Sequence, residues 1–151
     1  MLRQRLNDDL KTAMKARDQG ATSTLRMILA GIKDRDIAAR PQGNADGIDD
    51  AGILDLLQKM VKQRQESIEL YKQGGRQELV DKEQSEIDLI ERYMPQKLSE
   101  AEALAAIGDI VTELGATSIK DMGKVMAALK ERYAGQLDFA KAGGLVKQKL
   151  G

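Results

Sequence analysis

Apolar side chains recur every three or four residues along the chain, and no stretch alternates apolar and polar residues as a half-buried strand does. A period of this kind places the apolar side chains on one face of a helix. Aromatic residues make up only 3% of the 151 residues, so the core has to be built from aliphatic and methionine side chains. The sequence therefore predicts an all-α fold.

Residues 1–95 are expected to form an N-terminal helical bundle. Apolar stripes at 2–14 and 25–32 predict its first two helices. Thr22 or Ser23 is placed to cap the second of these helices, because a side-chain oxygen there can accept from an unpaired backbone N–H.

A long antiparallel helix hairpin is expected to complete this bundle. Asp49 is a plausible N-cap for its first helix, which ends at Gly74-Gly75, where glycine supplies the left-handed backbone of a C-terminal cap. The second helix is closed by Pro95. Because the connection is short, the two helices should fold back on each other.

Residues 96–151 are expected to form a small C-terminal domain of three helices. Ser99 and Glu102 have the spacing of a capping box, and Gly115 ends the helix that they open. Asp138 is placed to cap the last helix. We place the domain boundary next to Pro95.

Composition excludes several classes of protein. The chain has no cysteine and no histidine, so disulfides, thiol catalysis, thiolate metal sites and an imidazole general base are all excluded. We expect no metal and no small-molecule cofactor. No apolar run approaches a membrane span, and no apolar signal core is present, so a cytoplasmic protein without membrane contact is expected.

Charged residues interrupt the apolar stripes of the hairpin at Arg64 and Glu83. Folding the chain at the two glycines brings Arg64 level with Glu86 and about one turn from Glu83. A structural ion pair among Arg64, Glu83 and Glu86 would fix the register of the hairpin, or the long side chains could extend to water. The functional alternative is a buried acid or a phosphate-binding arginine, but nothing in the hairpin completes a catalytic set.

The last third of the chain is basic, although the whole chain is neutral. Residues 116–151 carry seven basic and three acidic side chains, a net charge of +4, whereas 48–115 carries eight basic and fifteen acidic ones. This segregation points to a polyanion such as RNA. The candidate RNA-binding residues are Lys120, Lys124, Lys130, Arg132, Lys141, Lys147 and Lys149. An ordinary solvated lysine surface is the alternative.

Two sets of segments resemble known families. Residues 59–71, Gly74-Gly75-Arg76 and Ile90-Glu-Arg-Tyr-Met-Pro95 resemble the YqeY family, and this resemblance covers essentially the whole chain. Lys120-Asp-Met-Gly-Lys-Val-Met126 and Leu145-Val-Lys-Gln-Lys-Leu150 are similar to the tail of the B subunit of glutamyl-tRNA amidotransferase.

The resemblance implies a helical bundle followed by a tail domain that helps to hold tRNA. It makes Gly123, Val125 and Met126 structural, and it places Lys124 where the motif varies. It also relates the chain to a carbon–nitrogen ligase that uses glutamine as amido donor, yet it transfers no catalytic residue to this sequence.

The expected function is therefore non-catalytic. The chain would bind tRNA, or associate with a protein partner in translation or tRNA amidation, through the basic C-terminal domain. A protein-interaction module that uses the acidic hairpin without binding RNA is the alternative. A glutamine-dependent amide transferase would need a Ser-Lys or metal-carboxylate site, which is not visible.

Overall fold

The computed structural model describes residues 1–151, and every regular element in it is helical, which confirms the all-α prediction. The α-helices are α1 (Leu2–Lys15), α2 (Gln19–Ala39), α3 (Asp50–Gln73), α4 (Gln77–Glu91), α5 (Glu100–Leu114), α6 (Met122–Arg132) and α7 (Phe139–Leu150). Short 3₁₀ turns, η1 (Arg40–Gln42) and η2 (Ile119–Asp121), precede α3 and α6. The chain divides into two compact units, Met1–Met94 and Pro95–Gly151. None of the helices combines the length and the apolar character needed to cross a membrane.

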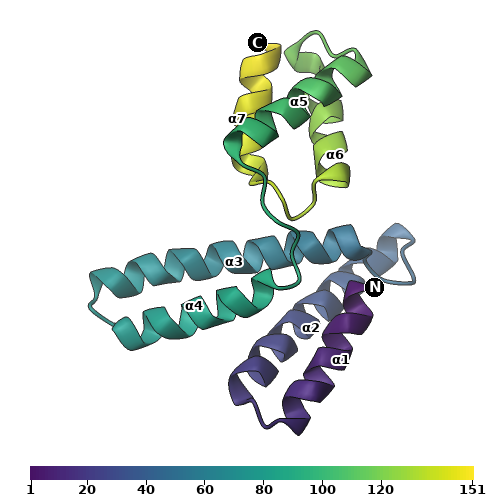
Figure 1. Cartoon of the computed structure of the whole chain (residues 1–151). Coiled ribbons are helices and arrows are strands. Elements are labelled where there is room, and N and C mark those ends of the chain that lie inside the picture. The colour runs from purple at the N-terminus through teal and green to yellow at the C-terminus, as the bar shows by residue number, and fades with distance from the viewer. The chain divides into compact units, whose positions relative to one another are not determined.

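The N-terminal unit consists of two helix hairpins. In the first, α1 and α2 lie side by side, and in the second, α3 and α4 do so after the reversal at residues 74–76 (Figure 1). α2 also packs against both helices of the second hairpin. Aliphatic side chains from all four helices form the core, with Leu6, Ile28, Leu57 and Ile90 fully buried.

The start of α2 differs from the expected one. The helix begins at Gln19, and the carboxylate of Asp18 accepts a hydrogen bond from the Ala21 N–H, so neither Thr22 nor Ser23 is the cap. The prediction was wrong because it started the helix at its apolar stripe. The first turn of a helix can be polar when a capping carboxylate satisfies its free N–H groups.

The other helix ends follow the local sequence. Asp49 caps α3 by accepting from the Gly52 N–H, and Asp138 caps α7. Ser99 and Glu102 form both bonds of the capping box at the start of α5. Gly75 adopts φ +68° at the reversal of the second hairpin, a backbone conformation that other residues rarely adopt. These cap predictions are confirmed.

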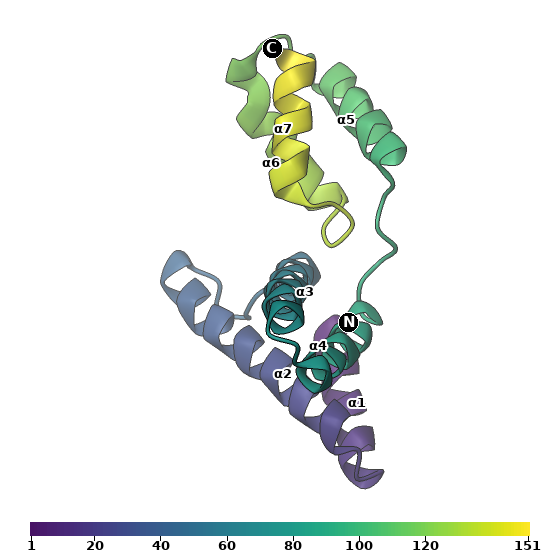
Figure 2. The ribbon, with the colours of Figure 1, turned by 90° about the vertical axis from the view of Figure 1, so that its left-hand side faces the viewer.

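The C-terminal unit packs α5, α6 and α7 around a second, separate core. α7 folds back along α6 after the loop 133–138 (Figure 2). Val125, Leu129 and Val146 are fully buried between these helices and α5. Because this core is complete within residues 95–151, the helices of the C-terminal unit position its surface side chains independently of the N-terminal unit.

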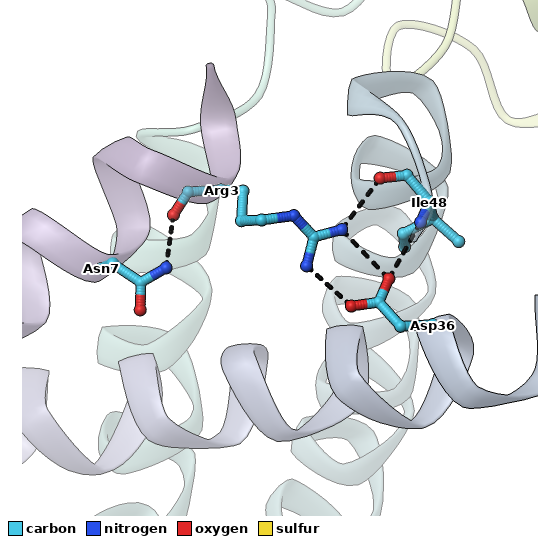
Figure 3. A network of polar contacts seen from close by, with 4 residues as sticks. All are labelled: Arg3, Asn7, Asp36 and Ile48. Carbon is cyan, nitrogen blue, oxygen red and sulfur yellow. Dashed lines mark hydrogen bonds and ion pairs between the residues drawn. The ribbon is translucent and has the colours of Figure 1, made fainter. Parts of the chain in front are cut away.

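A polar clamp joins α1, α2 and the segment that leads into α3 (Figure 3). Arg3 donates from both terminal nitrogens to the Asp36 carboxylate, at 2.7 and 3.0 Å, and from Nη2 to the Ile48 carbonyl at 2.9 Å. Asp36 also accepts from the Ile48 N–H at 2.9 Å. Asn7 donates to the Arg3 carbonyl at 2.9 Å. Both backbone groups of Ile48 are thereby satisfied next to the start of α3.

Replacing Asp36 with alanine should lower the free energy of unfolding by about 2 kcal/mol, because the Ile48 N–H and part of the Arg3 guanidinium lose their acceptor. Asp34→Ala is the matched control, since Asp34 is exposed on the same helix and has no hydrogen bond or ion pair. Urea denaturation measures both. Equal effects of the two substitutions would contradict the clamp.

The same pair predicts how stability depends on pH. The Arg3 hydrogen bond, followed by that of the Ile48 N–H, holds the pKa of Asp36 below its usual value. A lowered folded-state pKa contributes stability above the ordinary carboxyl pKa, and this is lost as pH falls through the lowered value. Between about pH 4 and pH 2, the wild type should therefore lose more stability than Asp36→Ala does.

Candidate nucleic-acid interface

The C-terminal unit separates its charges instead of being basic throughout. It carries eight basic and seven acidic side chains, and α5 holds four of the acidic ones and no basic one. α7, in contrast, has three lysines and no acidic residue. All seven candidate RNA-binding residues are exposed and lie on η2, α6 or α7.

Four of the seven residues lie at the same end of the α6–α7 pair. Because α7 returns along α6, its last turns lie beside η2 (Figures 1 and 2). We call Lys120, Lys124, Lys147 and Lys149 the basic end. None of these four lysines takes part in an ion pair within 4.0 Å. Their charges are therefore available to a ligand.

Asp121 is the one acidic residue in η2, the first turn of α6 and the last two turns of α7. Its carboxylate accepts from the backbone N–H groups of Thr117 and Ser118, at 3.0 and 3.4 Å. These two hydrogen bonds lower the pKa of Asp121, and the nearby charge of Lys124 lowers it further. The carboxylate is thus engaged by the backbone, and it neutralises at most one of the four lysines.

Arg132 does not belong to the basic end, and its guanidinium is paired with a carboxylate of α5. It donates to both carboxylate oxygens of Glu113 on α5, at 2.6 and 2.8 Å. The hydrogen bonds from Arg132 lower the pKa of Glu113. The fork geometry of the pair joins α6 to α5. Lys130 is likewise outside the basic end, near the last turn of α6, and Lys141 lies in the first turn of α7.

Arg64 forms an ion pair inside the N-terminal unit. Its Nε lies 2.9 Å from Glu86 Oε2, and the two side chains are only 11% and 13% exposed. The Arg64 terminal nitrogens donate to the Met60 carbonyl at 3.2 Å and to Met27 Sδ at 3.7 Å. Glu83 is half-buried and makes no hydrogen bond or ion pair. With its donors directed at α2, α3 and α4, Arg64 connects helices.

A second cluster, around Tyr93, had no signal in the sequence. The Tyr93 hydroxyl donates a short hydrogen bond to Asp9, and the Arg5 guanidinium lies 4.7 Å from the centre of the Tyr93 ring. Burial, aided by Asp9, raises the pKa of Tyr93. The partners are 84 residues apart, so no local pattern reveals them. The cluster fastens the end of α4 to α1. The structure holds no group of three or more acidic side chains suited to a metal ion.

The fold and its surfaces define a class of small helical proteins with two separate cores and a lysine-rich end. The chain belongs to the YqeY family: the family model described as Yqey-like protein matches residues 3–150. The similarity to the amidotransferase tail remains a resemblance of two short segments.

Three curated relatives of this chain carry the same name. The chain is 39% identical over 111 residues to altered inheritance of mitochondria protein 41, mitochondrial, of Lachancea thermotolerans, which is 72% of this chain and 57% of that protein. It is 41% identical over 105 residues to the protein of the same name from Eremothecium gossypii, covering 69% and 55%. For the Saccharomyces cerevisiae protein the match is 36% over 91 residues, covering 60% and 47%. The chain thus spans about half the length of these relatives.

The names of these relatives correct the expected location. They are mitochondrial proteins, so the prediction of a cytoplasmic protein was wrong. That prediction used the lack of an apolar signal core and of a membrane span. Neither feature bears on mitochondria, because transit peptides are amphipathic and rich in arginine rather than apolar.

Replacing Arg64 alone with alanine should lower the free energy of unfolding by about 3 kcal/mol, since it leaves Glu86 buried and unpaired. The double variant Arg64→Met/Glu86→Leu should recover most of this loss, because an apolar pair needs no desolvated charge. Urea denaturation measures both variants. Glu83→Gln serves as the control and should change stability by less than about 0.5 kcal/mol. A double variant no more stable than Arg64→Ala would show that the charges themselves are required.

Proposed function

We propose that this chain binds tRNA through its phosphate backbone, that the basic end makes the contact, and that the chain performs no chemistry of its own. One observation carries the proposal. All four lysines of the basic end lie in the two segments that resemble the amidotransferase tail, 120–126 and 145–150. The folding of α7 along α6 brings these segments together.

Lysine suits phosphate contacts without base recognition. Its ammonium group is a point charge on a flexible stem, and most contacts of this kind position a nucleic acid without reading its sequence. Each lysine that neutralises a phosphate releases counterions, so binding should weaken steeply as salt rises. Four free lysines are a modest number, which favours weak and salt-sensitive binding.

The absence of catalysis is part of the proposal. With no cysteine or histidine, a nucleophile or base would have to come from carboxylates, lysines or hydroxyls. Arg64 and Glu86, which are only 11% and 13% exposed, bind each other. Amide transfer by the purified chain alone, measured with glutamine and mischarged tRNA, would overturn this part.

The triple variant Lys120→Glu/Lys124→Glu/Lys147→Glu should weaken tRNA binding at least about tenfold at low salt. The slope of the logarithm of the binding constant against the logarithm of the salt concentration should become less steep by the amount expected for about two to three lost phosphate contacts. Filter binding with total tRNA at several salt concentrations measures both. The control is Lys11→Glu/Lys33→Glu/Lys62→Glu, which makes the same charge change at exposed lysines of the N-terminal unit that have no ion pair. A wild type without salt-sensitive binding would refute the proposal.

The acidic hairpin supports a second candidate, a protein-interaction module. α4 carries six acidic residues and one basic residue. Leu70 on α3 is 68% exposed, and it lies one residue after Glu69 and one helical turn after Glu66. A leucine this exposed within an acidic surface suits a partner with a basic rim around an apolar contact.

The second candidate predicts a partner that survives nuclease treatment. A pull-down with the wild type should recover one stable protein, and Leu70→Asp should lose it. Leu104→Asp is the matched control, because Leu104 is also exposed but lies on α5. Equal recovery with both variants would exclude the hairpin as the contact.

A further inference from the structure

We propose that the RNA feature bound by the basic end is an A-form double helix, and that the outward face of α7 lies along it. This inference rests on the proposed function, and it names the form of RNA that this same surface accepts.

Single-stranded RNA lacks a stacking surface on this chain. The protein has three tyrosines, one phenylalanine and no tryptophan. Tyr93 is buried, and Tyr71, Tyr133 and Phe139 are half-buried against the two cores, so no aromatic ring is exposed. Proteins that bind single strands gain about 1–3 kcal/mol from each base stacked on such a ring. This chain can therefore bind a single strand only through its charged side chains.

Two of the three lysines of α7 stand on opposite flanks of its outward face. Ala142 and Val146 are buried, so the exposed side of the helix is the one that carries Gln148. This side is flanked by Lys147 of the basic end and by Lys141, which lies outside the basic end in the first turn of α7. The two lysines are about 120° apart around the helix axis. No acidic residue lies anywhere on α7.

Positive charges on both flanks match two phosphate rows better than one. A single strand offers only one row of phosphates to these two flanks. A duplex presents two strands on either side of a groove, and the minor groove of A-form RNA is wide and shallow with exposed 2′-hydroxyls. Gln148, between the flanks, can donate to or accept from such hydroxyls. B-form DNA accepts a helix only in its major groove, because its minor groove is about 6 Å wide, and it has no 2′-hydroxyls for Gln148 to contact.

Fluorescence anisotropy at low salt tests this inference with the full chain and three labelled ligands. These are an RNA hairpin with a stem of about 16 base pairs, a single-stranded oligouridylate of the same charge, and a B-form DNA duplex of the stem's length. We expect the RNA stem to bind at least tenfold more tightly than the single strand, and several-fold more tightly than the DNA.

Equal or tighter binding of the single strand, or of the DNA, would overturn the A-form assignment while leaving RNA binding intact. If none of the three ligands and no tRNA binds, the proposed function fails together with this inference.

A pair of glycine variants tests the face itself. Gly144 lies on the outward side of α7, and a Cβ there would meet nothing within 4 Å. Gly144→Glu should therefore fold normally, and it should weaken binding of the RNA stem about tenfold by placing a negative charge against the phosphates. Gly108→Glu on α5 is the matched control, since a Cβ at Gly108 also meets open space, and it should change binding less than twofold. Thermal melts confirm that both variants are folded. Equal effects of the two substitutions would overturn the placement of α7.

Discussion

Burial of one aliphatic stripe on each helix is the constraint on which the whole structure depends. With almost no aromatic side chains, no single large residue can anchor a core, so each helix has to contribute several close contacts. Leu6, Ile28 and Ile90 serve this purpose in the N-terminal unit, and Val125 and Val146 serve it in the C-terminal unit. Because the two sets do not share a core, each unit positions its own surface.

Polar interactions then determine how the helices are held within that frame. Arg3 and Asp36 bind both backbone groups of Ile48, and Arg64 uses its donors on Glu86, Met60 and Met27. These side chains therefore stabilise the fold. The four lysines of the basic end form no ion pair, and this difference separates candidate ligand contacts from structural charges.

Local signals in the sequence account for most of the helix boundaries. Asp49, Ser99 and Asp138 were recognised because a capping side chain bonds to N–H groups only two or three residues away. The start of α2 was misjudged because Asp18 precedes a polar first turn, which the apolar pattern does not mark. Contacts such as Tyr93 with Asp9 join residues far apart in the chain, and no periodic pattern encodes them.

The sequence by itself determined the helical class, most of the helix ends and the basic character of the last third, because propensity, capping and charge are local properties. Only the tertiary structure decided which charges act together. It paired Arg132 with Glu113 of α5 and thereby removed it from the free basic side chains. It brought Lys120 and Lys124 to the end of the helix pair that holds Lys147 and Lys149. The reason is physical: electrostatic fields depend on distances in space, and the return of α7 along α6 sets those distances.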